Sequence, residues 1–514
     1  PVAHLAALEG RVPFLNVFDG FRTSHELHKI AVWAYDDLKS MVDPEALNAF
    51  RQRSLHPSHG KVYGSAQNPD IFFQTREASN SFYLALPGIV EEQLTQINWR
   101  LGTSYGLFDY YGAPDAEHVI IAMGSICETI KEYIDSVPGE KIGLINVHLY
   151  RPFSKSHLAE KLPKSVRQIS VLDRTREPGS VGEPLYLDVV AALTACGIPL
   201  SAVCTDCAAA RFSHGSEAYE PLFICSGRYG LSSKDTTPAQ IAAVYRNHTR
   251  PVFTVGITDD VTHLSLEVPA IPETAPKDIV SCKFWGLGGD GTVSATKNAI
   301  KIIGNHTDMT TQGYFEYDSK KSRGLTISHL RFGKSPVRSA YLIRKADLTA
   351  CHNPVYLHKY DMVQEIKDGG TFLLNFHPKE QDSPEKEAAA GNPVSRAQGS
   401  AHSSDPQKDS LTRELDRYLP LSVKQYLKEH NIRLFVIDAL GIGKEIGLNN
   451  KISTILQSAF FAVSNLLEPE DAKRWMNEAA EKSYGKSGAK ILEMNRIAIE
   501  RGFSEVVEMA LPEE

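Results

Sequence analysis

The chain has 514 residues, of which 42% are hydrophobic and 23% charged, and its formal net charge is −7. This length and composition predict about three globular domains and exclude wholesale disorder. The mild acidity carries no electrostatic signature of nucleic-acid binding, so we expect no nucleic-acid partner.

The first 116 residues read as two helices and a strand. The apolar run Val12–Asp19 predicts a buried strand, and the stretch that follows predicts a helix capped by Thr23 or Ser24. Residues 71–97 predict a second helix, broken at Pro87. Because the chain opens on proline within a helix-like stretch, we expect a fragment or a processed product.

A regular alternation of strands and helices begins near Ala116 and runs to about residue 250. This pattern is typical of a doubly wound parallel sheet. The predicted strands are 117–125, 142–153, 168–175 and 221–231, and the predicted helices are 126–137, 155–162, 188–197 and 237–248. Residues 269–278 contain three prolines and predict a linker between domains.

A second alternation follows the linker and predicts a second doubly wound unit. Its predicted strands are 279–286, 313–318, 339–353, 370–377 and 432–440, with a helix over 292–304. Between the last two strands, about residues 378–410, large apolar side chains are almost absent, which predicts a disordered surface insertion.

The sharpest local motif is G-x-G-x-x-G at Gly286, Gly288 and Gly291, between a predicted strand and a predicted helix. Glycines let the backbone turn tightly and approach a diphosphate, whose charge the helix N-terminus stabilises. A plain strand-to-helix turn is the alternative. We favour phosphate binding because the motif follows a predicted strand and precedes a predicted helix, as phosphate-binding turns do.

The next predicted strand ends at Asp318, and Lys320 and Lys321 follow. An acidic residue at that place suits a ribose hydroxyl, whereas two lysines suit a second phosphate. A ligand with a diphosphate and a separate ribose phosphate fits both features. NADP and coenzyme A are both such ligands.

Three further clusters give weaker signals of function. The turn Gly124–Ser125 could face an anion, but more often such a turn only ends a strand. Residues 19–26 gather an arginine, a histidine and two acids, a cluster that is either catalytic or a capping element. The charged turn 173–179 predicts a salt-bridge network.

Cysteine usage predicts a reducing compartment, because seven scattered cysteines make no disulfide framework. Cys204 and Cys207 form a lone C-x-x-C without a second ligand pair, so we expect no metal site there. The most apolar stretch, residues 186–204, is interrupted by polar and turn-forming residues, so we expect no membrane partner.

Many collinear segments resemble one family, the pyruvate:ferredoxin (flavodoxin) oxidoreductases. They are VPFLNVFDGFRTSHELHKI, NPDIFFQTREASNSFY, LFDYYGAPDAEHVIIAMGSICETI, LYRPFS, VLDRTREPGSVGEPLYLDV, GRYGLSSKDTTPAQI, FTVGITDDVTHLSL, FWGLGGDGTVSATKNAIKIIG, YFEYDSKKSRGLTISHLRFG and GTFLLN. The resemblance covers nearly everything except the 378–410 insertion.

The resemblance implies an α/β fold with two doubly wound parallel-sheet domains. Residues 117–268 would form a transketolase C-terminal-like domain and residues 279–514 a γ-type coenzyme A-binding domain, with 269–278 as linker. Residues 1–116 would be the C-terminal part of a thiamine pyrimidine-binding domain. The implied reaction is oxidative decarboxylation of pyruvate to acetyl-CoA, with electrons passed to iron–sulfur clusters and on to ferredoxin or flavodoxin.

The resemblance also implies which residues contact coenzyme A. They are Gly288, Gly289, Asp290, Gly291, Thr292, Lys320, Ser453 and Asn495. Ser453 stands where the family has an asparagine, and Arg323 stands where glycine is usual. Thiamine diphosphate, Mg and [4Fe-4S] clusters are expected in the full-length enzyme, with their ligands and all catalytic residues outside this chain.

The main hypothesis is thus a central fragment that binds coenzyme A and is inactive alone. Alternatives are a subunit that works with separate partners, a non-catalytic binding or scaffold module, and an NADP-binding Rossmann dehydrogenase. A homodimer and a cytoplasmic location are expected, with an organelle such as a hydrogenosome or plastid as the other compartment.

Overall fold

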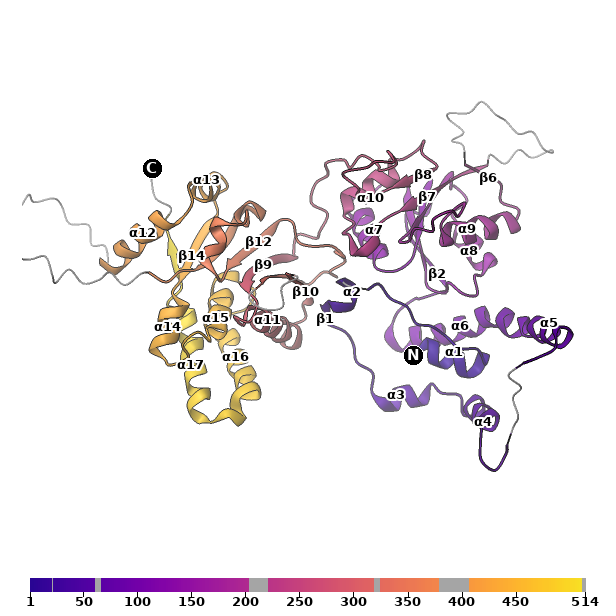
Figure 1. Ribbon diagram of the computed structural model, residues 1–514, viewed down its shortest axis with the longest axis horizontal. Helices are drawn as coiled ribbons and strands as arrows, with labels where there is room; N and C mark the ends of the chain where they lie inside the picture. The colour runs from indigo at the N-terminus through magenta and orange to yellow at the C-terminus, as the bar shows by residue number, and fades with distance from the viewer. Residues whose placement is uncertain (21, 61–65, 203–220, 319–323, 379–405, 511–514) are drawn as a thin grey trace, which may run out of the picture. The chain divides into compact units, whose positions relative to one another are not determined.

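The computed structural model describes the chain except for residues 21, 61–65, 203–220, 319–323, 379–405 and 511–514. The chain divides into two compact units (Figure 1). The first comprises Pro1–Ser24, Ile30–Ala275 and Arg338–Tyr341, and the second His25–Lys29, Pro276–Val337 and Leu342–Glu514. The C-x-x-C at Cys204 and Cys207 and most of the 378–410 insertion lie outside the described residues.

The first unit is built on one sheet in the order β2-β4-β3-β5-β7-β6, with β8 paired to β7. All its pairs are parallel except that of β2 with β4. The strands are β2 (Phe108–Gly112), β3 (His118–Ala122), β4 (Ile142–Val147), β5 (Gln168–Asp173), β6 (Leu200–Ser201), β7 (Leu222–Arg228) and β8 (Val252–Thr254). The connecting helices are α7 (Ile126–Ser136), α8 (Lys155–Lys161), α9 (Pro184–Ala195), η1 (Leu231–Ser233) and α10 (Pro238–Tyr245).

Helices cover both faces of this sheet, which confirms the doubly wound prediction (Figure 1). Side chains alternate between the faces along each strand. In β3, Val119 and Ile121 pack beneath α8 and α9, whereas Ile120 and Ala122 pack beneath α7 and α10. The near-continuous apolar strands therefore reflect burial on both sides.

The short segment Arg338–Tyr341 is held in the first unit by a buried carboxylate. Glu132 on α7 accepts hydrogen bonds from the hydroxyls of Ser339 (2.6 Å), Tyr341 (2.5 Å) and Thr274 (2.6 Å). These bonds satisfy a charge that is only 2% exposed.

The N-terminal predictions are partly wrong. Val12–Asp19 forms no strand, and Leu15 and Val17 are 92% and 82% exposed, because an apolar run alone cannot supply a pairing partner. The helix expected from Thr23 is replaced by three short elements. The observed elements here are α1 (Val2–Gly10), α2 (Arg22–His25), β1 (Leu27–His28), α3 (Tyr35–Ser40), α4 (Pro44–Arg53), α5 (Pro69–Ala78) and α6 (Asn80–Leu101).

The predicted break at Pro87 is also wrong, because α6 continues through it. Leu86, Val90, Leu94 and Ile97 recur at helical spacing and are all buried. Burial of these side chains, most of which follow the proline, outweighs the roughly 3 kcal/mol that a proline costs a helix interior.

The second unit contains an eight-stranded sheet in the order β1-β10-β11-β9-β12-β13-β14-β15. The strands besides β1 are β9 (Val280–Leu287), β10 (Thr310–Tyr317), β11 (Leu325–Gly333), β12 (Ala346–Cys351), β13 (Ile366–Asn375), β14 (Arg433–Ile437) and β15 (Val507–Met509). The helices are α11 (Thr292–His306), η2 (Pro354–His358), η3 (Val363–Glu365), α12 (Pro406–Tyr418), α13 (Leu421–Glu429), α14 (Ala439–Glu445), α15 (Ser453–Ser464), α16 (Pro469–Tyr484), η4 (Gly485–Ser487) and α17 (Ala489–Ser504).

This second sheet is mixed. Strands β9, β12, β13 and β14 run parallel, as predicted for a doubly wound unit. Strand β11, which was not predicted, pairs antiparallel with both β9 and β10, and the edge strands β1 and β15 also pair antiparallel. One face is covered by α11 and α14 to α17, and the other by η2, η3, α12 and α13 (Figure 1).

Among the described residues, none of the helices combines the length and the apolar character that a membrane-crossing segment needs.

Candidate ligand site at the glycine turn

The glycine motif lies where β9 ends and α11 begins, as predicted. Asp290 stabilises this turn: its Oδ2 accepts the amide of Leu287 (2.7 Å) and its Oδ1 accepts the amide of Thr292 (2.8 Å). The amide of Gly288 donates to the carbonyl of Gly324 (2.7 Å). The Asp290 carboxylate is therefore engaged by the backbone, and its function is to hold the loop in shape.

Two glycines of the turn have left-handed backbones. Gly289 has φ of 95°, and nothing lies within 4 Å of the place where its Cβ would stand. Gly291 has φ of 92°, and a Cβ there would lie 2.8 Å from Cβ of Ser453. The turn thus offers open backbone at Gly289 and contacts the start of α15 at Gly291.

Ser453 and Asn495, far apart in the sequence, come close together beside the turn. Ser453 is the first residue of α15, and its neighbour Thr454 donates a hydrogen bond to Oδ1 of Asn495 (3.0 Å). Nδ2 of Asn495 donates to the carbonyl of Ile491 (2.9 Å), and Asn495 is 4% exposed. Asn495 therefore orients the first turn of α15.

Two helix N-termini consequently meet at the glycine turn. The first intrahelical bonds run from Ala295 to Gly291 in α11 (2.9 Å) and from Leu456 to Ile452 in α15 (3.0 Å). The amides that precede them have no partner inside their own helix. Both helix dipoles then favour negative charge at this place.

The strand order marks the same place. From β9 the chain crosses through α11 to β10 on one side of β9, whereas the neighbour on its other side is β12. Ligands of open α/β sheets bind at the carboxyl ends of strands where the order reverses in this way. The glycine turn stands at that switch point.

His352, which follows β12, is a residue of this site that the sequence analysis missed. Its Nδ1 lies 2.7 Å from Oγ1 of Thr292, and its carbonyl accepts from Nδ2 of Asn375 (2.9 Å). Its Nε2 is buried and makes no hydrogen bond within the described part of the chain. Burial lowers the pKa of His352 to about 4, although the Asp290 carboxylate opposes this effect, so the ring is neutral at pH 7.

We expect His352→Leu to lower the free energy of unfolding of the second unit by about 1–3 kcal/mol, because the buried Thr292 hydroxyl loses its partner. Denaturant unfolding of the single variants His352→Leu and Thr292→Val and of the double variant measures the coupling. The double variant should lose clearly less free energy of unfolding than the two single variants lose in sum. Strict additivity would contradict the assigned hydrogen bond.

A second charged group lies at the carboxyl ends of β13 and β14. His377 Nδ1 lies 2.8 Å from Oδ2 of Asp438, and Lys444 Nζ lies 3.3 Å from His377 Nε2. Asp438 also caps α14 by accepting the amide of Gly441 (2.7 Å). Lys444 is thus a cation on the same edge of the sheet as the glycine turn.

Lys320 and Arg323 lie outside the described residues. Asp318, just before them, donates its amide to the carbonyl of Leu325 (3.0 Å) and so anchors the end of β10 on β11. In the described ranges of the chain, no group of three or more His, Cys, Asp and Glu side chains could hold a metal ion.

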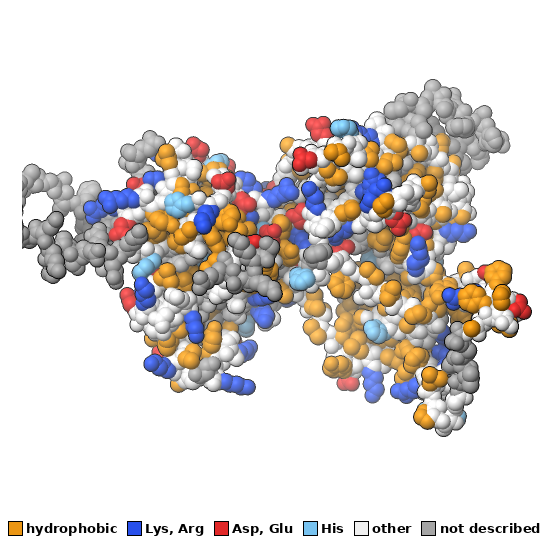
Figure 2. Space-filling view, in the orientation of Figure 1, with side chains coloured by type: hydrophobic (Ala, Val, Ile, Leu, Met, Phe, Trp, Pro, Cys, Tyr) orange, Lys and Arg blue, Asp and Glu red, His pale blue; other side chains and the backbone are white. Residues whose placement is uncertain are grey.

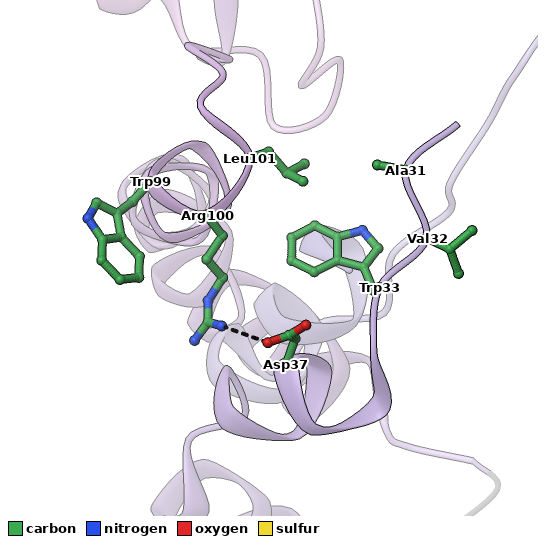
Figure 3. Close-up of a pocket in the computed structure, with 7 residues that line it drawn as sticks. All are labelled: Ala31, Val32, Trp33, Asp37, Trp99, Arg100 and Leu101. Atoms are coloured by element: carbon green, nitrogen blue, oxygen red, sulfur yellow. Dashed lines mark ion pairs between the residues drawn. The ribbon is translucent and has the colours of Figure 1, made fainter. Parts of the chain in front are cut away.

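A cavity of about 310 Å³ lies in the first unit, apart from the glycine turn. Trp33 and Leu101 face each other across it, and Arg100 forms an ion pair with Asp37 (3.8 Å) at its base (Figure 3). Trp99 points away from the opening (Figure 3) and is 83% exposed. Among the residues that line this cavity, Asp37 is the one group suited to acid–base chemistry, and its carboxylate is paired with Arg100.

Three family models match the chain. Residues 281–505 match pyruvate ferredoxin/flavodoxin oxidoreductase. Residues 1–94 match the thiamine diphosphate-binding domain of pyruvate flavodoxin/ferredoxin oxidoreductase, and residues 116–212 match core domain II of pyruvate:ferredoxin oxidoreductase.

Curated relatives match along almost the whole chain. Pyruvate:ferredoxin oxidoreductase of Moorella thermoacetica is 48% identical over 517 residues, which cover 99% of this chain and 40% of that protein. Pyruvate-flavodoxin oxidoreductase of Klebsiella pneumoniae is 45% identical over 520 residues, which cover 99% of this chain and 40% of that protein. Pyruvate dehydrogenase [NADP(+)] of Cryptosporidium parvum is 39% identical over 518 residues, which cover 99% of this chain and 24% of that protein.

The chain thus spans about 40% of the length of the bacterial relatives it matches. The family resemblance predicted from the motifs is confirmed by these identities and by three collinear family models. The chain belongs to the pyruvate:ferredoxin (flavodoxin) oxidoreductase family.

Proposed function

We propose that this chain supplies the coenzyme A-binding part of an enzyme that oxidatively decarboxylates pyruvate to acetyl-CoA. The observation that carries the proposal is the glycine turn at which the N-termini of α11 and α15 meet. The names of the relatives support pyruvate as the substrate and ferredoxin or flavodoxin as the electron acceptor.

The described geometry fits a diphosphate. Among the described residues, the amides of Gly289 and Gly291 make no hydrogen bond within the protein, and the space over Gly289 is open. A diphosphate placed there would accept these amides and face both helix N-termini. Thr292 and Asp290 would hold the loop, and Ser453 would offer its hydroxyl.

The ribose phosphate of coenzyme A is assigned to Lys320, because that lysine follows β10, the strand that α11 connects to the turn. Ser453, in place of the family's asparagine, offers one hydroxyl rather than an amide. We therefore expect the diphosphate and the ribose phosphate to supply most of the affinity.

Titration calorimetry on the 514-residue chain tests the assignment with three ligands. Coenzyme A should bind, and dephospho-coenzyme A, which lacks the ribose phosphate, should bind at least about tenfold more weakly. NADPH should not displace coenzyme A. Undetectable binding of coenzyme A at millimolar concentration, with an intact circular dichroism spectrum, would sink the proposal, and tight NADPH binding would favour the dehydrogenase alternative.

Residues 1–94 match a thiamine diphosphate-binding model, and their surface suits a part of a larger domain. Large apolar side chains are exposed along this stretch, including Phe73 (70%) and Leu84 (81%). Exposed apolar side chains gather over α5 in the space-filling view (Figure 2). We propose that further protein of the assembled enzyme covers them, and that thiamine diphosphate, Mg and the [4Fe-4S] clusters are held by that protein.

Turnover on this proposal needs the whole enzyme. Pyruvate-dependent reduction of a viologen dye by the full-length protein would rule out a non-catalytic scaffold module. We further propose a homodimer in the cytoplasm, or in an organelle such as a hydrogenosome or plastid, and sedimentation velocity of the full-length protein tests the dimer.

A further inference from the structure

A second small cavity, of about 20 Å³, lies in the first unit at the start of α7. It is lined by side chains from the turn before α7, from Arg22 and from the segment after β7. Of these, Ser125 belongs to the Gly124–Ser125 turn, and Arg22 belongs to the 19–26 cluster that the sequence analysis singled out. The coenzyme A proposal uses none of them.

Thr129 on α7 points to a ligand here. It is fully buried, with 0% exposure, and it lines the cavity. Its Oγ1 makes no hydrogen bond to any residue that the structure describes. A buried hydroxyl without a partner costs free energy, so this one calls for an acceptor or a donor from the cavity.

The charges around the cavity favour an anion. Its lining includes three cations, Arg22, Arg174 and Lys234, against one carboxylate, Asp235. Asp235 lies 3.4 Å from Arg22 Nη1, and no described carboxylate forms an ion pair with Lys234.

Asp19 lies beside the lining and is already engaged. Its Oδ2 accepts the amide of Ser125 (2.6 Å) and lies 3.4 Å from Arg174 Nη1. The carboxylates near the cavity are therefore committed to the helix start and to the two arginines. The charge of Lys234 is left for a ligand.

We propose that this cavity binds a small oxyanion, a carboxylate or a phosphate. About 20 Å³ admits one oxygen atom, which would accept the Thr129 hydroxyl, and the rest of the anion would lie at the mouth. Lys234 and Arg174 would neutralise it there. The site is independent of the glycine turn, which belongs to the other unit.

Equilibrium dialysis and thermal unfolding of the 514-residue chain test this site with sodium phosphate and sodium acetate, each against sodium chloride at equal ionic strength. We expect one or both oxyanions to bind and to raise the unfolding temperature of the first unit by mass action. Binding of phosphate or of acetate shows whether the natural ligand carries a phosphate or a carboxylate. If neither binds above the chloride background, the proposal is overturned.

Two variants separate the cavity from general surface attraction. Thr129→Val is isosteric and removes the unpaired hydroxyl, so the fold should persist while the anion dissociation constant rises at least about tenfold. Lys234→Met should have a similar effect, and Lys161→Met on α8, an exposed lysine elsewhere in the unit, should have none. Normal anion binding by Thr129→Val would overturn the cavity assignment.

Discussion

Gly291→Ala is expected to weaken coenzyme A binding by more than about tenfold and to lower the unfolding temperature of the second unit. The backbone of Gly291 has φ of 92°, and an added Cβ would lie 2.8 Å from Cβ and 3.1 Å from Oγ of Ser453. A left-handed backbone costs a non-glycine residue about 1–3 kcal/mol. The clash adds to this cost by pushing α15 away from the turn. Calorimetry with coenzyme A and thermal unfolding measure the two effects.

A matched control separates local strain from the loss of the site. Gly369, at the amino end of β13, has φ of 71° and nothing within 4 Å of its Cβ position. Gly369→Ala should therefore destabilise the second unit by the backbone cost alone, about 1–3 kcal/mol, and leave coenzyme A affinity unchanged.

Ser453→Gly in the Gly291→Ala background removes the clash and should recover part of the affinity, provided that the lost hydroxyl contributes less than the clash costs. Unchanged affinity in Gly291→Ala would mean that the contact between the turn and α15 does not shape the ligand site.

Acidification is expected to destabilise the first unit through His118. This side chain is 5% exposed, its Nδ1 lies 3.1 Å from the carbonyl of Tyr245, and its Nε2 lies 2.9 Å from Oγ of Ser170. Burial lowers the pKa of His118 to about 3, an effect that the nearby His248 reinforces and the Tyr245 carbonyl opposes. The ring is therefore stable in the fold only when it is neutral.

The direction in which stability changes with pH follows from proton uptake. Between pH 6.5 and pH 3 the unfolded chain protonates His118 and the folded chain does not, so stability falls as the pH falls. The full loss would be roughly 5 kcal/mol. His118→Asn cannot titrate, so its free energy of unfolding should depend less steeply on pH than that of the unchanged chain. Urea unfolding followed by tryptophan fluorescence between pH 4 and pH 7.5 measures the two slopes.

His263→Asn is the matched control, since His263 is exposed and its φ of 56° suits asparagine. It should leave the pH slope unchanged. Equal slopes for the unchanged chain and His118→Asn would show that the buried imidazole is not the group that couples folding to pH here.

The strand–helix alternation predicted most of both sheets. Strands such as β3 and β5 are buried on both faces, so runs of apolar residues dominate their sequences and make them easy to recognise. Strand β11 was missed because its polar side chains, including His329 and Arg331, are buried by partners elsewhere in the chain. Val12–Asp19 was misread for the converse reason, since its apolar residues find no partner strand.

Some residues of the candidate site could likewise be predicted from the sequence, and others could not. The glycine turn was recognisable from its motif, because glycine spacing between a strand and a helix reports a local backbone requirement. Ser453 and Asn495 came only from the family resemblance. No local sequence pattern marks His352 or Thr129. His352 belongs to the site because its ring bonds the Thr292 hydroxyl, and Thr129 stands out because its buried hydroxyl has no partner among the described residues.

The sequence by itself therefore determined the family, the two α/β units and the glycine turn at which we propose that a phosphate binds. All of these depend on residues within a few turns of one another, or on collinear motifs. The tertiary structure alone decided that α15 begins against Gly291, that His352 supports Thr292, and that cations from three segments line one cavity beside Thr129. Such contacts join residues tens to hundreds of positions apart, and side-chain packing, which no local pattern encodes, brings them together.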